Sequence, residues 1–203
     1  GNDTFNITDK SGAFTDTIDG SSGTDTLDID YSGVTSLGSF TSFSYDSSTE
    51  TFTAVDSNGG TINWKNIENL TVGDYAYTRV TDNSDNAENA FWNSTEKVLY
   101  MFNGASVGSE LWKTTDSDEL SSLSINDDVT VQGSSGGDTM NLNVDRASDY
   151  TGNWTLNMKD GNDSFYSAKL KNGDSVDMGA GDDYIAFMVS GGSGTPTIAN
   201  LDL

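Results

Sequence analysis

The chain has 203 residues, 32 of them acidic and 9 basic, and a formal net charge of −23. Nucleic acid is therefore excluded as an expected partner, because phosphate binding needs a basic face. The sequence contains neither cysteine nor histidine, which argues against zinc sites, thiol redox chemistry and histidine-based catalytic triads.

The first part of the chain is predicted to form short strands. Polar and apolar residues alternate over residues 4–7, 16–19 and 26–29, so that Phe, Ile and Leu would face the core. The segment between the second and third strands contains Gly20 and Gly23, and glycine permits the positive φ of a tight turn. Asp19 and Asp25 flank this turn, and we expect that they can share a metal ion.

Residues 32–73 continue with strands, including a hairpin whose turn lies at residues 56–60. Residues 74–122 differ, because glycine turns become sparse and aromatic side chains gather. We interpret this stretch as an insertion in a stack of coils, with a short helix over residues 84–93 capped by Ser84. Insertions on one face of a solenoid often carry its binding site.

The insertion supplies a candidate ligand pocket beside a candidate metal site. An alternative interpretation is a solvated acidic loop in which Arg79 pairs with a neighbouring aspartate. The metal candidates are Asp74, Asp82 and Asp85, and the ligand-binding candidates are Tyr75, Tyr77, Arg79, Glu88, Trp92 and Trp112.

Alternating strands return over residues 123–189, and one phrase, Gly-x-Asp-x-apolar, recurs along the chain. Each glycine allows a turn, each aspartate directs a carboxylate into it, and the apolar residue starts a strand facing inward. The copies are Gly1-Asn2-Asp3-Thr4-Phe5, Gly23-Thr24-Asp25-Thr26-Leu27, Gly136-Gly137-Asp138-Thr139-Met140, Gly161-Asn162-Asp163-Ser164-Phe165 and Gly181-Asp182-Asp183-Tyr184-Ile185.

These turns predict calcium, which takes about 6–8 oxygen ligands from carboxylates and backbone carbonyls. Coils twenty residues apart would bring Asp163 and Asp183 together, and an ion between them would turn repulsion into attraction. Ordinary β-turns, in which Asp and Gly are common, are the alternative. The primary ligand candidates are Asp3, Asp25, Asp138, Asp163 and Asp183, with Asp19, Asp160 and Asp182 as second carboxylates. Acidic residues at 116–119 and 127–128 form a weaker candidate.

The segment from Gly179 to Ala186 resembles the calcium-binding nonapeptide of RTX proteins, Gly-Gly-x-Gly-x-Asp-x-U-x, which winds a parallel β-roll or β-helix. In this chain the copies of the Gly-x-Asp-x-apolar phrase lie 20 to 25 residues apart in the regular stretches. We therefore expect coils longer than those of a roll with a nine-residue repeat. The predicted fold is all-β: an irregular, calcium-stitched parallel β-solenoid. It forms a single domain over residues 1–203, with a mixed insertion at 74–122 and a tail at 191–203. A β-sandwich with calcium-binding turns is the alternative; a narrow core, with 33% hydrophobic residues, suits a solenoid.

The composition and the coils flanking an aromatic middle are similar to the peptide-binding domain of large bacterial RTX adhesins. This resemblance implies a calcium-dependent adhesin module that holds the C-terminal end of a peptide or protein on a host or neighbouring cell, with calcium helping to grip the carboxylate. It also implies a monomeric module of a larger chain, exported by a type I-like route to the bacterial cell surface. A lectin-like module that binds glycans and a purely structural spacer or surface-layer segment remain alternatives.

An enzyme is not expected. Calcium-dependent polysaccharide lyases need a basic residue beside the metal, and Lys159 is the one basic residue within the calcium motifs. No apolar run is long enough to cross a bilayer, so membrane insertion is not expected either.

Overall fold

The computed structural model describes residues 1–81, 87–102, 105–107, 127–142, 152–170, 172–189 and 197–199. It confirms the all-β prediction. The described strands are β1 (Thr4–Thr8), β2 (Thr15–Asp19), β3 (Thr26–Asp30), β4 (Phe40–Asp46), β5 (Thr51–Asp56), β6 (Thr61–Lys65), β7 (Asn69–Val72), β8 (Tyr75–Thr81), β9 (Ala87–Asn93), β10 (Val98–Met101), β11 (Ser106–Val107), β12 (Val129–Gln132), β13 (Thr139–Leu142), β14 (Trp154–Asn157), β15 (Ser164–Leu170), β16 (Ser175–Asp177), β17 (Tyr184–Val189) and β18 (Thr197–Ala199).

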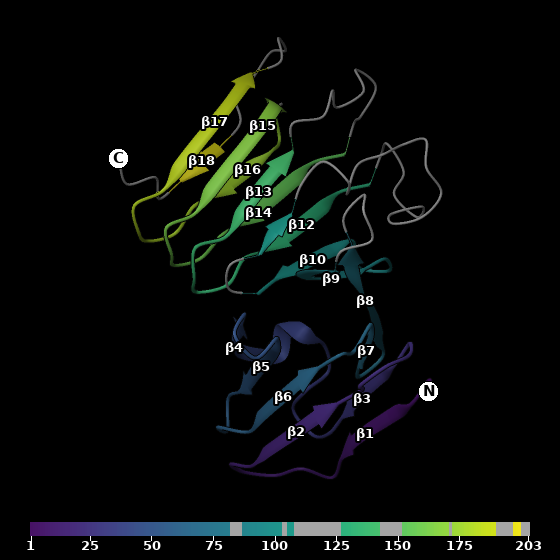
Figure 1. Ribbon diagram of the computed structural model, residues 1–203. Helices are drawn as coiled ribbons and strands as arrows, with labels where there is room; N and C mark the ends of the chain where they lie inside the picture. Colours follow the sequence, from purple (N-terminus) through teal and green to yellow (C-terminus); the bar gives the residue numbers. More distant parts are fainter. Residues whose placement is uncertain are drawn as a thin grey trace.

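A ten-stranded mixed sheet runs the length of the molecule in the order β1-β3-β7-β8-β9-β10-β12-β14-β16-β18 (Figure 1). Its first three strands are parallel to one another, and so are its last five. Between them, β7, β8, β9 and β10 pair antiparallel. Strands β8, β9 and β10, which lie within 74–122, thus continue the sheet and link its two parallel parts.

Two four-stranded sheets complete the fold. One has the order β2-β6-β5-β4, and the other, β11-β13-β15-β17, is wholly parallel. From β12 to β18 the chain alternates between the long sheet and this parallel sheet at every strand. Figure 1 shows the consequence: β13, β15 and β17 lie in front of β14, β16 and β18 in the upper part of the molecule.

The alternation of polar and apolar residues positions these strands. In β6 the burial alternates between intermediate and buried, and Ile62 and Trp64 are the residues that face the core. In β12 the inward residues are Val129 and Val131. This is the period of two expected for strands that cover a core on one face.

The middle strands behave differently because they have a hydrophobic cluster on each face. Phe91 of β9 and Tyr100 of β10 belong to the cluster of the N-terminal half. Their neighbours Trp92 and Leu99 belong to the cluster of the C-terminal half. The aromatic residues that gather in this stretch are therefore the packing between the two halves.

The helix predicted over residues 84–93 is wrong for its described part, because residues 87–93 form β9. Ala90, Phe91 and Trp92 are buried in succession, which erases the period-two signal of an ordinary strand. Among the described residues, a 3-10 turn is found at Leu37–Ser39. No helix in that part of the chain has the length and apolar character needed to span a membrane.

Candidate functional site

The glycines of the repeated phrase stack on one another from turn to turn. Gly23, Gly161 and Gly181 have φ of +144°, +145° and +146°, a region that side chains rarely occupy. A Cβ on Gly181 would run into the carbonyl oxygen of Gly161, and one on Gly23 would run into that of Gly1. Both the backbone conformation and the contact between turns therefore require glycine.

The aspartates that follow these glycines form a ladder of hydrogen bonds. The N–H of Asp138 donates to Oδ1 of Asp163 at 2.7 Å, and the N–H of Asp163 donates to Oδ1 of Asp183 at 2.9 Å. All three aspartates are buried, and Asp163 is only 1% exposed. Asp163 and Asp183 therefore lie close together, as predicted. In each of these two residues, Oδ1 accepts a hydrogen bond from the backbone N–H of the aspartate in the preceding turn.

A second, shorter ladder lies in the N-terminal half. The N–H of Asp3 donates to Oδ1 of Asp25 at 2.7 Å, and the N–H of Asp25 donates to Oε2 of Glu68 at 2.8 Å. Asp25 is fully buried. In the opposite direction, Oδ1 of Asn2 accepts the N–H of Thr24, just as Oδ1 of an asparagine accepts a turn N–H in the C-terminal ladder.

The second carboxylate oxygens are the unusual feature of both ladders. Oδ2 of Asp25, of Asp163 and of Asp183 is buried and accepts no hydrogen bond within the described part of the chain. A buried, charged oxygen without a partner is costly, and native structures normally supply a proton, a donor or a cation for it.

The pKa of Asp163 also indicates that a buried negative charge in the C-terminal ladder is unfavourable without a partner. Burial raises the pKa of Asp163 to about 7; the N–H of Asp138 opposes this rise, and the nearby carboxylates of Asp138, Asp183 and Asp160 add to it. Burial also lowers the pKa of the Lys159 ammonium, although the charge of Asp138 acts to raise it. Lys159 is thus one protein cation close to the ladder, and its Nζ lies 5.4 Å from the ring centroid of Phe43.

The donor set fits a hard cation, but the side chains alone do not complete a shell. Across the described ranges, no group of three or more Asp or Glu side chains converges so as to hold a metal ion. Any calcium at the ladder would therefore use one or two carboxylates together with backbone carbonyl oxygens and water, which calcium accepts readily. Carbonyl oxygens do lie close to these turns. The carbonyl oxygen of Asn66 and Oδ2 of Asp25 both lie where a Cβ on Gly20 would be.

The other metal candidates take several different positions. Asp3, Asp160 and Asp182 lie exposed in the same turns as the ladder residues. Asp19 is exposed: its carboxylate accepts bonds from Ser21 N–H and the Asn66 amide and pairs with Lys65 at 3.1 Å. The hydrogen bond from Asn66 contributes most to lowering the pKa of Asp19, followed by that from Lys65. Asp82 and Asp85 lie outside the described residues.

The candidates for ligand binding are mostly part of the interior. Tyr77 and Trp92 are buried, and the Tyr77 hydroxyl accepts the N–H of Leu37 at 3.1 Å. Arg79 donates to the carbonyl oxygen of Glu88 at 2.9 Å and lies 4.8 Å from the ring centroid of Phe52.

Burial lowers the pKa of Arg79, against the pull of nearby Tyr45, Glu68 and Glu50. Tyr75 is half-buried and packs against the N-terminal cluster. Trp112 lies outside the described residues.

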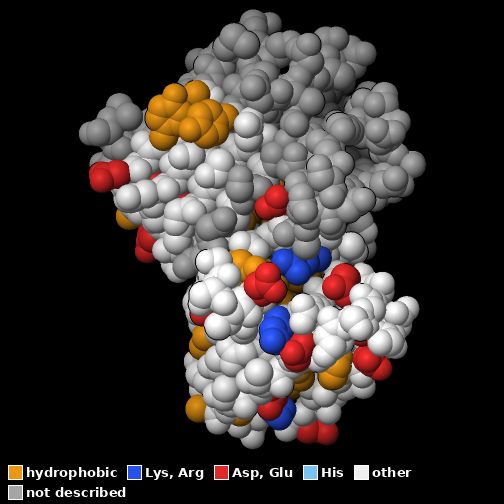
Figure 2. Space-filling view, viewed as in Figure 1, with side chains coloured by type: hydrophobic (Ala, Val, Ile, Leu, Met, Phe, Trp, Pro, Cys, Tyr) orange, Lys and Arg blue, Asp and Glu red, His pale blue; other side chains and the backbone are white. Residues whose placement is uncertain are grey.

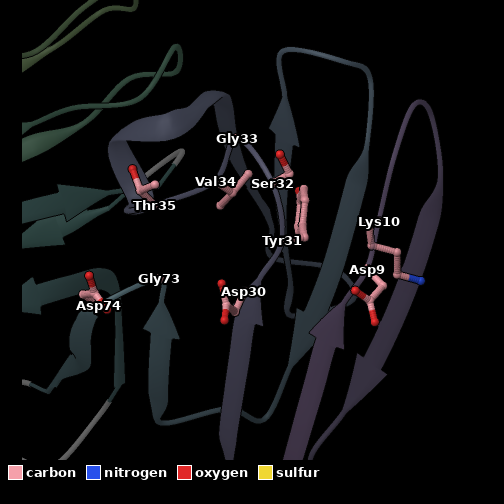
Figure 3. A pocket seen from close by; sticks show the side chains of 10 residues that line it. All are labelled: Asp9, Lys10, Asp30, Tyr31, Ser32, Gly33, Val34, Thr35, Gly73 and Asp74. Carbon is pink, nitrogen blue, oxygen red and sulfur yellow. The ribbon is translucent and has the colours of Figure 1, made fainter.

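One pocket, of about 640 Å³, does contain a predicted metal candidate, Asp74. It forms where the adjacent parallel strands β1, β3 and β7 end, so that Asp9, Asp30 and Asp74 come to one edge of the sheet. In Figure 3, Asp30 lies between Asp74 on one side and Asp9 on the other. Lys10 also lines the pocket, and its Nζ pairs with Asp16 at 2.8 Å.

The sequence analysis did not name Glu68 or Asp174, and it placed Asp128 only in the weaker acidic cluster at 127–128, although each of the three accepts a backbone N–H. Glu68 ends the N-terminal ladder, Asp174 accepts the N–H of Trp154 at 3.0 Å, and Asp128 accepts the N–H of Asn153 at 2.7 Å. Asp128 and Asp174 each stand just before a strand of the long sheet, so their position before an alternating run was the available signal. Glu68 had none, because its partner is 43 residues away.

The fold and the site thus define an all-β protein with buried aspartate ladders between glycine turns. The sequence matches no known family model, and no curated protein matches it.

Proposed function

We propose that this chain is a calcium-stitched β-solenoid module of a large bacterial cell-surface protein of the RTX adhesin type. Its role is non-catalytic and mechanical: a monomeric segment, stiffened by calcium, within a longer exported chain. The observation that carries the proposal is the set of buried Oδ2 atoms of Asp25, Asp163 and Asp183 that accept no hydrogen bond in the described residues. Extracellular calcium is the cation that this donor chemistry suits best.

The solenoid interpretation is supported by the path of the chain from β12 to β18. Each strand pairs in parallel with the strand two positions along the sequence, as successive coils do. The offsets between paired residues are 25 for β12 with β14 and 20 for β14 with β16. A sandwich of antiparallel strands would instead pair neighbours through hairpins.

Calcium would be held by the ladder aspartates at the turns between coils. Asp163 and Asp183 would supply Oδ2, and the turn carbonyls and water would supply the remaining oxygens. The bound ion supplies positive charge that offsets the mutual repulsion of these carboxylates. Without it, the buried charges and the net charge of −23 oppose folding. Stability of the module is then linked to calcium concentration by mass action.

A structural role is favoured over partner binding by the packing of the aromatic residues. Phe52 stacks on Trp64 with ring centroids 5.5 Å apart, and it meets Phe91 and Phe102 edge-on at 5.4 and 5.1 Å. Side chains engaged in this way are unavailable to a ligand, and they stabilise the junction between the two halves of the long sheet.

The test is a calcium titration followed by thermal unfolding, with EDTA and magnesium as comparisons. Calcium at 100 times its dissociation constant should stabilise the protein by about 2.7 kcal/mol per site. Asp163→Asn and Asp183→Asn should lower this gain, whereas Glu50→Gln, which removes an exposed charge outside the ladders and the Asp74 pocket, should leave it unchanged. A melting temperature that is the same in millimolar calcium and in EDTA would contradict the proposal.

A second candidate is the peptide-binding adhesin module, and the pocket at Asp74 favours it. A calcium ion held there by carboxylates could leave a coordination position for the C-terminal carboxylate of a peptide. Calorimetry should then give heat with free-carboxylate peptides, no heat with amidated ones, and at least tenfold weaker binding after Asp74→Asn. Heat from sugars at this pocket would indicate a lectin, and heat from neither would leave the structural role alone.

A further inference from the structure

Two tyrosines stand out on the outer face of the sheet β11-β13-β15-β17. Tyr166 is 38% exposed and Tyr184 is 52% exposed, and they are the large apolar side chains that the described surface leaves open. Their ring centroids are 5.2 Å apart with the planes tilted by 43°. Figure 2 shows an orange patch on the upper part of the molecule, over the region of β15 and β17.

The register of the sheet explains why the rings meet. Tyr184 lies beside Ser164, and Tyr166 lies beside Ala186, so the two tyrosines occupy diagonal positions on adjacent parallel strands. Diagonal neighbours on one face of a sheet are within reach of aromatic side chains. Phe165, between the two outward positions of β15, points into the core.

The positions paired with the two tyrosines in the described part of this face are uncharged. On β13, Thr139 pairs with Ser164 and Asn141 pairs with Tyr166, which extends the patch by one hydroxyl and one amide side chain. The six outward positions so defined carry no Asp, Glu, Lys or Arg, in a chain whose net charge is −23. A neutral, aromatic area with polar neighbours therefore interrupts a strongly acidic surface.

We propose that this tyrosine pair is a binding site for a neutral carbohydrate. A sugar ring presents apolar C–H faces, which pack on an aromatic face, and hydroxyl groups, which exchange hydrogen bonds with Ser, Thr, Asn and the Tyr hydroxyls. The acidic surroundings repel anionic polymers, and the absence of carboxylates within the patch gives a cationic ligand no partner. A neutral saccharide is the ligand whose chemistry matches both the aromatic rings and the uncharged polar side chains of the site. The site lies away from the Asp74 pocket and does not depend on the proposed mechanical role.

The test uses the whole chain in millimolar calcium. Its retention is measured on insoluble cellulose and chitin, and in affinity electrophoresis gels containing soluble neutral glucan or galactan. Wild-type protein should be retarded by at least one of these polymers. Tyr166→Ala and Tyr184→Ala should each weaken binding by roughly tenfold, an effect typical of one lost aromatic contact together with its packing.

Two controls keep the experiment decisive. Thr155→Ala changes an exposed residue of β14 on the opposite sheet and should bind like the wild type. Circular dichroism and the calcium-dependent melting temperature should be unchanged in the tyrosine variants, which separates failure of this site from failure of calcium stabilisation. The proposal is overturned if no neutral polymer retards the wild type, or if both alanine variants bind equally well. Self-association that the tyrosine variants abolish would assign the patch to a second copy of the chain instead.

Discussion

Asp163→Asn should stabilise the calcium-free protein at neutral pH, although it removes a residue of the ladder. The pKa of Asp163 is raised to about 7 in the folded protein, against an ordinary value of 3.8. The unfolded chain therefore releases this proton at lower pH than the folded chain does. Unfolding becomes easier as pH rises from about 4 to 7, and the effect is constant above that window.

The size of the effect follows from the same values. The gap is roughly three pH units, and at about 1.4 kcal/mol per unit the charged carboxylate costs about 4 kcal/mol at pH 8. Asparagine has nearly the same shape, and its Oδ1 can still accept the N–H of Asp138. Its NH2 group takes the place of the unbonded Oδ2, which costs about 1–3 kcal/mol when a buried donor lacks an acceptor. The net gain is then about 1–3 kcal/mol, which for a chain of this length corresponds to roughly 2–12 °C in melting temperature.

The assay is thermal unfolding in EDTA at pH 4, 6 and 8, for wild type, Asp163→Asn and the exposed control Glu50→Gln. The wild type should lose stability between pH 4 and 8, and Asp163→Asn should flatten this loss while the control does not. With calcium present the wild type should be more stable than Asp163→Asn, because the variant lacks the charged carboxylate oxygen that would bind calcium. A variant less stable than the wild type in EDTA at pH 8 would refute the reasoning.

Three further predictions concern the scaffold and can be checked by chemical denaturation. Gly181→Ala should cost at least about 2 kcal/mol more than Gly12→Ala, because the new Cβ meets backbone at the first site and open space at the second; equal costs would contradict the stacking of the turns. Phe52→Ala should lower the free energy of unfolding by about 3–5 kcal/mol, since its ring contacts the aromatic residues that join the two halves; a loss below 1 kcal/mol would mean that the cluster repacks. Tyr31→Phe should cost about 1–3 kcal/mol at neutral pH, because its hydroxyl donates to Oδ2 of buried Asp56 at 2.9 Å.

The last prediction also has a pH dependence. Burial acts to raise the pKa of Asp56, but the N–H groups of Gly60 and Asn58 and the Tyr31 hydroxyl outweigh it and hold that pKa below its ordinary value. The stability that this carboxylate contributes is present above its unfolded pKa and is lost as pH falls through the folded one. The difference between wild type and Tyr31→Phe should therefore shrink in acid, and a difference that grows below pH 4 would contradict this assignment.

The sequence by itself determined the strands and the turns of the coils. Alternation placed β1, β2 and β3 almost residue for residue, because one-sided burial leaves a period-two record in the local sequence. The Gly-x-Asp phrase likewise marked the turns, since positive φ near +145° restricts the residue type directly. The spacing of twenty residues was enough to bring Asp163 beside Asp183.

Only the tertiary structure decided what surrounds these residues. Helix was predicted for residues whose described part forms β9, and a ligand pocket was predicted around Tyr77 and Trp92, because clustered aromatics leave no local record of which face they cover. In the fold a separate hydrophobic cluster packs on each side of β9 and β10, and those side chains fill the two clusters. Equally, Asp19 and Asp25 are near in sequence but differ in environment: one pairs with Lys65 at the surface and the other is buried against Glu68. Burial and hydrogen bonding depend on partners tens of residues away, and only the folded chain brings those partners into contact.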